Sequence, residues 1–251
     1  MLGDQIAVHI NELSAASLVP EPRPAKIAIQ CIFIACVLGL LRPGAQAQSS
    51  QDQSWPEVDL YAELTSRLRV SYQVKRSTDG NNYDQVQLGP MLSLTLKSIL
   101  RPRLRSNDIS KDRYVTFGVG YQYLTGTSGS PENRGVLQLT PRFPLPLSIL
   151  LSDRNRIDLR VISGSFSWRY RNRLTLERSF KIKSVAFTPY VRGEVFYNSK
   201  YQTWDKNSYA VGVTVPVGKH AELQPYTQHD NSTHASPQHV NALGFITSFY
   251  F

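Results

Sequence analysis

Long stretches of this sequence alternate between apolar and polar residues, and the longest runs from Glu57 to Lys75. Successive side chains of a β-strand point to opposite faces, so this period of two predicts a strand with one apolar face and one polar face. An average strand in a globular protein has about 5–6 residues, whereas a tilted strand of about 9–11 residues crosses a bilayer. The length of the alternation therefore predicts an all-β fold and favours a membrane barrel.

Nine further segments alternate in a similar way, at approximately 85–99, 115–123, 136–143, 155–161, 166–178, 187–197, 209–217, 221–228 and 240–251. Together they predict an antiparallel up-and-down transmembrane β-barrel of about ten strands, within a range of about eight to twelve. An even number is expected for a single-chain bacterial barrel. If the N-terminus is periplasmic, the connections on the outer side are 76–84, 125–134, 162–165, 198–205 and 229–238.

The outward register of these strands, as assigned, holds no Asp, Glu, Lys or Arg. A single Arg or Lys facing the middle of a bilayer costs about 2–4 kcal/mol, so a membrane barrel requires such a register. A soluble β-sandwich also buries one face and is the alternative, although its strands are usually shorter. Interfacial girdles of a membrane barrel would account for the aromatic residues near the expected strand ends, which are Tyr72, Tyr123, Trp168, Tyr170, Tyr197 and Trp204.

The chain closes on a strongly hydrophobic strand. One face of the segment 240–251 carries Leu243, Phe245, Phe249 and Phe251, with Thr247 as its polar interruption. A strand that closes a membrane barrel turns this face toward lipid. We expect this strand to pair with the segment 58–74 and its terminal Phe to be recognised by the barrel assembly machinery.

An export signal precedes the strands. The segment 26–41 is an apolar core behind basic residues, and Ala45-Gln46-Ala47 is a small-x-small cleavage site. We therefore interpret residues 1–47 as a signal peptide cleaved after Ala47, with 1–25 as an extension upstream of the true start. The alternative is an uncleaved anchor. Residues 48–251 are expected to form a single β-barrel domain in the outer membrane of a Gram-negative cell.

Cleavage would remove Cys31 and Cys36, so the mature chain would have no thiol for a disulfide or a metal. The formal net charge of +9 could suggest nucleic acid, but an exported chain rarely meets nucleic acid. The expected partners are outer-membrane lipid and the assembly machinery, and the expected state is a monomer.

Charge gathers in the inward register. Rings of Arg or Lys favour anions, so a narrow porin-like channel for small anionic solutes is one interpretation. Side chains fill small barrels, so a lumen packed with ion pairs is the other, and the one that we favour. The predicted lumen cluster consists of Arg67, Arg69, Arg156, Arg160, Arg169, Arg171, Arg173, Arg192, Asp59, Glu63, Asp158, Glu177 and Glu194.

The segment 229–239 concentrates residue types that could carry chemistry, namely His229, Asp230, Ser232, His234 and His239. A lipid hydrolase at the membrane rim would need Ser activated by a base. The spacing matches no arrangement of this kind, and such polar loops are ordinary turn chemistry. We therefore expect no enzyme, and we assign no catalytic, cofactor or metal-binding residue; the hydrolase is kept as a second alternative to the structural or interaction barrel.

Several segments resemble the uncharacterised bacterial family called domain of unknown function 2490. The resemblance implies an outer-membrane barrel without an assigned activity, and it transfers no catalytic residue. It is clearest from about residue 153 onward. The matching segments are Asp153-Arg154-Asn155-Arg156, Trp168-Arg169-Tyr170-Arg171-Asn172-Arg173-Leu174, Thr188-Pro189-Tyr190, Glu194-Val195-Phe196-Tyr197, Gln224-Pro225-Tyr226, Asn241-Ala242-Leu243-Gly244 and Tyr250-Phe251.

Overall fold

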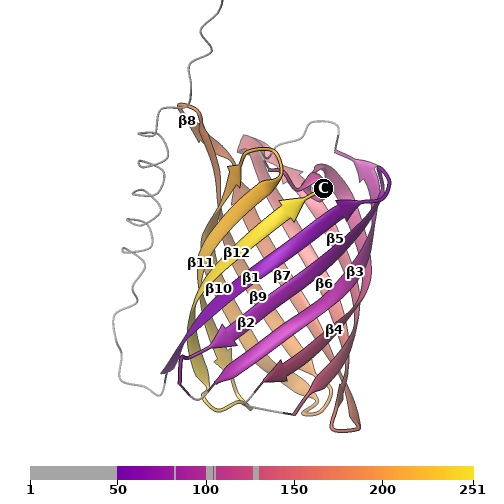
Figure 1. Cartoon of the computed structure of the whole chain (residues 1–251), viewed down its shortest axis with the longest axis vertical. Helices are drawn as coiled ribbons and strands as arrows, with labels where there is room; N and C mark the ends of the chain where they lie inside the picture. The colour runs from indigo at the N-terminus through magenta and orange to yellow at the C-terminus, as the bar shows by residue number, and fades with distance from the viewer. Residues whose placement is uncertain (1–49, 82, 100–103, 105, 127–129) are drawn as a thin grey trace, which may run out of the picture. The chain divides into compact units, whose positions relative to one another are not determined.

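A computed structural model describes residues 50–81, 83–99, 104, 106–126 and 130–251, and within them the chain forms a closed β-barrel (Figure 1). The predicted signal peptide and its cleavage site lie outside the described residues. Eleven long strands close the wall, and the short strand β8 pairs only with β9. No helix in the described part of the chain is long and apolar enough to span a membrane.

The strands of the wall are 11 to 15 residues long. They are β1 Ser50–Glu63, β2 Leu68–Thr78, β3 Asp84–Ser98, β4 Arg113–Gly126, β5 Glu132–Leu145, β6 Ile149–Ile162, β7 Ser165–Arg178, β9 Val185–Asn198, β10 Thr203–Val217, β11 Ala221–Ser232 and β12 His239–Tyr250. The remaining elements are β8 Phe180–Ile182 and the 3-10 turns η1 Ile109–Asp112 and η2 Pro146–Ser148. An all-β barrel of about ten strands is therefore confirmed.

The first predicted strand is in fact a hairpin. The segment Glu57 to Lys75 divides into β1 and β2 at the turn 64–67, where the Thr65 hydroxyl accepts hydrogen bonds from the N–H groups of Arg67 and Leu68. Five residues separate the directly paired Glu63 and Arg69, and because this number is odd, paired residues on the two strands have the same parity, as Ala62 of β1 and Val70 of β2 do. A period of two therefore continues through the turn, which is why the pattern resembled one long strand.

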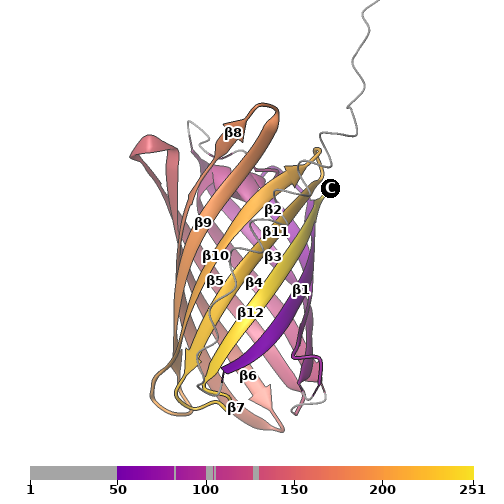
Figure 2. The same cartoon turned by 90° about the vertical axis from the view of Figure 1, so that its left-hand side faces the viewer.

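The extra strand changes how the barrel closes. β1 and β12 pair in parallel, from Ser50 beside His239 to Tyr61 beside Tyr250, and Figure 2 shows the two strands side by side. The final strand therefore pairs with the first part of the predicted segment 58–74, which belongs to β1. The expectation of an even, wholly antiparallel barrel is wrong, because an odd number of alternating strands brings the first and last strands together in the same direction.

The parallel closure also separates the two termini of the barrel. One end, called here the N-terminal end, holds Ser50, residues 79–81 and 83, and the turns 163–164, 199–202 and 233–238. The other, called the C-terminal end, holds Phe251 and the turns 64–67, 146–148, 183–184 and 218–220. The predicted grouping of connections is kept, but the N-terminus lies with the connections expected outside.

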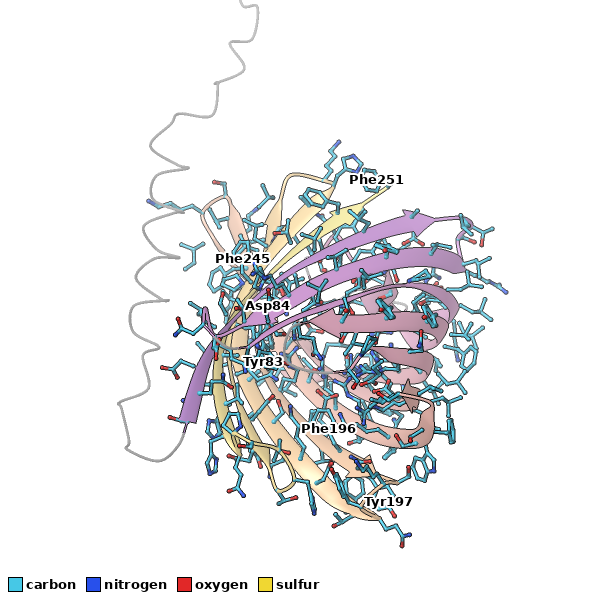
Figure 3. The ribbon with its side chains drawn as sticks, turned by 60° about the horizontal axis from the view of Figure 1, so that its bottom comes forward. Tyr83, Asp84, Phe196, Tyr197, Phe245 and Phe251 are labelled. Carbon is cyan, nitrogen blue, oxygen red and sulfur yellow. The ribbon has the colours of Figure 1, made fainter. Side chains whose placement is uncertain are left out.

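Side chains on the wall are arranged with apolar groups outward and charged groups inward. Figure 3 shows Phe196 in the lumen, next to Tyr197 on the outer surface. Phe196 is 5% exposed, whereas large apolar residues of the outward register are about half exposed, among them Leu243 at 52% and Phe245 at 41%. The predicted outward set of the final strand, which also includes Phe249 and Phe251, is exposed as expected.

A small buried cluster inside the barrel contains Tyr190 and Tyr226, together with Trp55, Ala210 and Ala242. Tyr226 of β11 is directly paired with Gly212 of β10 and Gly244 of β12. Its ring lies over Gly244, and the ring of Tyr190 lies over Gly212. A Cβ on Gly244 would lie 2.0 Å from the ring carbon Cζ of Tyr226. Glycine is therefore needed at Gly244 for the close approach of the ring rather than for backbone freedom.

We expect Gly244→Ala to destabilise the barrel by about 1–3 kcal/mol, because the ring of Tyr226 must move out of its packed position. Equilibrium unfolding in detergent would measure the loss. Gly193→Ala is the matched control, since nothing lies within 4 Å of its added Cβ. Equal effects of the two substitutions would contradict the role assigned to the ring.

Candidate functional site: the charged lumen

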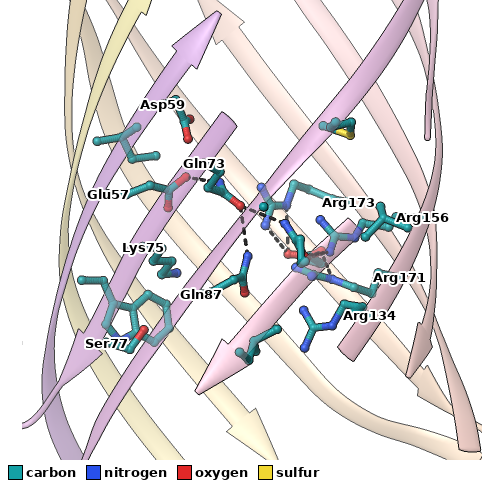
Figure 4. Close-up of a pocket in the computed structure, with 18 of the residues that line it drawn as sticks. Glu57, Asp59, Gln73, Lys75, Ser77, Gln87, Arg134, Arg156, Arg171 and Arg173 are labelled. Carbon is teal, nitrogen blue, oxygen red and sulfur yellow. Dashed lines mark hydrogen bonds and ion pairs between the residues drawn. The ribbon is translucent and has the colours of Figure 1, made fainter. Parts of the chain in front are cut away.

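The lumen contains a cavity of 470 Å³ whose walls are strongly polar (Figure 4). Among the described residues that line it, basic side chains outnumber acidic ones by nine to four. The basic residues are Lys75, Arg134, Arg154, Arg156, Arg169, Arg171, Arg173, Arg192 and Lys206, and the acidic ones are Glu57, Asp59, Glu194 and Asp230. The cavity therefore carries an excess of positive charge.

Glu194 is shared by three arginines. This residue of β9 is 3% exposed, and its carboxylate lies 2.9 Å from Arg154, 2.9 Å from Arg171 and 2.6 Å from Arg173. Arg154 lies on β6 and the other two lie on β7, so ion pairs join three neighbouring strands. Charge-assisted bonds to guanidinium groups are the strong class of hydrogen bond, and they hold this part of the lumen in one arrangement.

A second carboxylate, on β6, is also shared by several arginines. Asp158 of β6 is 1% exposed and pairs with Arg156, with Arg171 at 3.6 Å and with Arg134 at 3.9 Å. Arg134 also pairs with Glu132 at 2.8 Å. Arginines thus form a continuous ladder across β5, β6, β7 and β9, with fewer carboxylates than guanidinium groups.

The wall opposite the ladder is made largely of amides. The side chain of Gln73 donates to Glu57 and accepts hydrogen bonds of 3.0 Å from Gln87 and from Gln122. Figure 4 shows Glu57, Gln73 and Gln87 across the cavity from Arg134, Arg156, Arg171 and Arg173. The lumen is therefore asymmetric, with positive charge concentrated on one side.

The segment 106–112 obstructs the C-terminal end of the lumen. Asp108 accepts a hydrogen bond of 2.7 Å from Arg69 of β2, and Lys111 donates one of 2.7 Å to Glu177 of β7. Ser106 and Asn107 both donate to Glu222 of β11. β2, β7 and β11 stand on different sides of the barrel, so these contacts can be made only from inside it. The segment is therefore a plug.

Electrostatics hold the plug in place. Burial alone would raise the pKa of the Asp108 carboxyl, but Arg69, Lys111 and Arg142 outweigh it and hold that pKa well below its ordinary value of 3.8. Burial likewise lowers the pKa of Lys111, whereas Glu177, Asp108 and Glu222 outweigh it and raise that pKa above its ordinary value. Both side chains are therefore charged over the neutral pH range.

Replacing Asp108 by Asn is expected to loosen the plug. Hydrogen bonds to charged groups contribute about 1.5–3 kcal/mol, so hydrogen exchange at the amides of Ser110 and Lys111 should accelerate by at least about tenfold at pH 7. A depressed pKa stabilises the folded state above the ordinary value of 3.8, and this contribution is lost as the pH falls below that value. Wild type and variant should therefore converge only in acid.

Asp112→Asn is the control for this experiment. Asp112 lies in the same turn, but burial and the neighbouring Asp108 raise the pKa of its carboxyl, so the charge does not stabilise the plug. Exchange that accelerates equally in both variants would contradict the role of the bond between Arg69 and Asp108.

Most of the predicted lumen cluster does line the interior. Asp59, Arg69, Arg156, Asp158, Glu177 and Glu194 are buried, and Arg160, Arg169, Arg171, Arg173 and Arg192 are partly buried. Arg67 is the exception: it lies exposed in the turn between β1 and β2, because the predicted strand folds back there. Glu63 lies at the end of β1 and pairs with Arg69.

Sequence reasoning missed lumen residues wherever strands were expected to be too short. β5 begins at Glu132 rather than near residue 136, which places Glu132 and Arg134 in the lumen. β6 begins at Ile149 rather than near residue 155, which adds Arg154. Extending the same period of two backward into the flanking residues would have found all three. The plug segment 106–112 shows no alternation of apolar and polar residues, so no pattern predicted its position.

The longer β6 also corrects the expected absence of charge outside. Asp153 lies in the outward register near the middle of the wall, where Asn172 of β7 donates a hydrogen bond of 2.6 Å to it. Asn172 also donates to Asn155, which accepts another hydrogen bond from Tyr170. The charge is thus partly compensated within a polar patch. Other outward charges, such as Arg76, lie near strand ends.

The structure divides the predicted histidine loop between different surfaces. Asp230 points inward and pairs with Lys206 at 2.6 Å, while His229 is exposed on β11 and His234 stacks on Tyr201. The Ser232 hydroxyl donates to the backbone carbonyl of Asp205, a partner that cannot act as a base. No cluster of three potential metal ligands occurs among the described residues. The geometry adds no support for the hydrolase.

Comparison with known families agrees with the motifs on this wall. The family model described as a protein of unknown function, DUF2490, matches residues 52–241. The chain belongs to this family. No curated protein and no solved structure matches the chain. The match extends from β1 into β12, so the arginine ladder of this DUF2490 protein lies within the family region.

Proposed function

We propose that this DUF2490 protein is exported and spans the outer membrane as a structural or interaction barrel with a plugged, ion-paired lumen. The observation that carries the proposal is the apolar outer surface. Exposed large apolar side chains occur on every wall strand except β11, and Asp153 is the one mid-wall charge among the described residues. Strands of 11 to 15 residues are long enough to cross a bilayer at a tilt. A soluble barrel would instead expose its charge and bury these side chains.

Two further observations support a membrane. Trp168 stacks on Tyr197, which also contacts Trp204 edge to face, so aromatic rings gather on the outer wall toward the N-terminal end. Aromatic rings are enriched at membrane interfaces. The exposed Phe251 at the end of β12 fits recognition by the barrel assembly machinery, which we propose as a partner.

Membrane fractionation of expressing cells tests the location. We expect the wild-type chain in the outer membrane, and a variant lacking Phe251 exported but poorly inserted. Recovery of the wild-type chain from the soluble fraction would contradict the proposal. Because a mature chain cleaved after Ala47 would have no cysteine, single Cys variants at Ser50, Asn81 and Lys219 could then be labelled with a membrane-impermeant reagent. Ser50 and Asn81 should react from one side of the membrane and Lys219 from the other.

A narrow anion channel is the second candidate, favoured by the basic excess in the lumen. The plug argues against free conduction. Planar bilayers distinguish the two: the plugged barrel should show few openings, and steady anion current through the wild-type protein would favour the channel.

A further inference from the structure

We propose that the lumen binds a soluble, polyvalent oxyanion of the phosphate class, which enters from the N-terminal end and is held by the arginine ladder. This ligand site goes beyond the proposed location of the protein, since it depends on the interior of the barrel alone.

The first reason is the charge imbalance within the cavity. Nine basic side chains face four acidic ones, an excess of five positive charges in the described lining. Glu194 is already shared by three arginines. Asp158 and Glu132, which lie behind the lining, pair with Arg156 and Arg134 and reduce the excess to three. Charges of one sign enclosed by low-dielectric walls concentrate counter-ions between them. An anion from solution would balance the positive charge that remains.

The second reason is that two arginines of the cavity lack an acidic partner. Among the described residues, Arg169 and Arg192 form no ion pair, and the Nε of Arg169 is buried without a hydrogen-bond partner. Arg169 faces the ring of Phe196, with 6.0 Å between its Cζ and the ring centroid. Arg192 donates to Gln228 and stands over Tyr226. Buried polar groups in native proteins normally have partners, so the unpaired donors mark a place for a ligand.

The valence and geometry of the site select the class of anion. A monovalent carboxylate would balance only one of these excess charges, whereas a polyvalent anion balances several at once. The planar guanidinium fork binds phosphate oxygens in pairs, and forks from the adjacent strands β6, β7 and β9 line one side of the cavity. The volume of 470 Å³ lies in the usual range of about 300–1,000 Å³ for small-molecule sites.

The route of entry points to a soluble anion rather than a lipid headgroup. Every strand of the wall is hydrogen-bonded to a neighbour on each side, including the seam between β1 and β12, so no lateral opening admits a lipid. The plug obstructs the C-terminal end through Arg69, Glu177 and Glu222. The lining reaches Ser77 and Tyr83, next to the N-terminal turns, which leaves that end as the entrance.

Titration calorimetry with inorganic pyrophosphate, on the purified protein in a non-ionic detergent, tests the site. We expect saturable binding that weakens as salt rises, and acetate should bind at least about tenfold more weakly. Arg169→Gln and Arg192→Gln should each weaken pyrophosphate binding by about tenfold or more, while Arg192→Lys, which keeps the charge, should lose less. Circular dichroism would verify that each variant retains its β-structure.

Arg178→Gln is the matched control, because Arg178 is exposed at the end of β7 and the substitution removes the same charge. Unchanged affinity for pyrophosphate in this variant would support the site. A loss equal to that of Arg169→Gln or Arg192→Gln would show that binding depends only on the total charge of the protein, and would overturn the site. Absence of binding, or displacement of pyrophosphate by micellar phosphatidic acid, would also overturn a site for a soluble anion. Neither result would bear on the outer-membrane location, which fractionation tests separately.

Discussion

Replacing Glu194 by Gln is expected to lower the free energy of unfolding of the barrel by about 3–5 kcal/mol. The side chain is 3% exposed and is the shared partner of Arg154, Arg171 and Arg173. Without its charge, three guanidinium groups would remain close together where their mutual repulsion is poorly screened. The loss should therefore exceed that of an ordinary surface ion pair several-fold.

Urea unfolding in detergent, followed by tryptophan fluorescence, would measure this loss. Glu63→Gln is the control, since the Glu63 side chain is 29% exposed and its partner Arg69 keeps Asp108; we expect about 1 kcal/mol or less. Adding Arg173→Gln to the Glu194 variant should restore part of the stability, because it removes one uncompensated charge. If Glu194→Gln and Glu63→Gln lowered the free energy of unfolding equally, sharing among three arginines would add no stability.

Placing a positive charge on the outer wall is the second change with a large expected effect. Leu139 is 45% exposed near the middle of β5, beside Phe117 of β4. Leu139→Arg should lower the stability of the barrel in lipid vesicles by about 2–4 kcal/mol, because the guanidinium group would face hydrocarbon. Vesicle insertion and unfolding from vesicles would report it.

The control is Leu147→Arg. Leu147 is 71% exposed in the turn η2 at the C-terminal end, where an added charge reaches water. This variant should insert like the wild type. If Leu139→Arg were as well tolerated as Leu147→Arg, the outer wall would not face lipid, and the proposal of a membrane-spanning barrel would fail.

The sequence prediction was accurate where apolar and polar residues alternate clearly. Leu243 and Phe245 were placed on the outer face and Asp158 and Glu194 in the lumen, because each lies inside a segment whose alternation is unambiguous. Errors arose at strand ends, where polar residues suit both a loop and a lumen. Asp153 precedes the expected strand 155–161, but it lies in β6 as a charge on the outer wall.

The sequence predicted which charged residues of the candidate site face inward, but not which of them form ion pairs. Alternation indicates that Arg171 and Glu194 face inward, but not that they lie 2.9 Å apart. That distance depends on the register between β7 and β9, where Arg173 pairs with Glu194. The plug was beyond prediction, because Asp108 and Lys111 lie in a non-periodic link whose position depends on partners from β2 and β7.

The sequence by itself determined the two faces of the wall, because the side-chain period of a strand assigns every second residue to the same face whatever the strand pairs with. Only the tertiary structure decided the number of strands and the parallel seam between β1 and β12. An odd number of residues between the paired Glu63 and Arg69 leaves the period undisturbed, so the hairpin cannot be recognised in the pattern. The ion pairs across the lumen likewise required the register of the closed barrel.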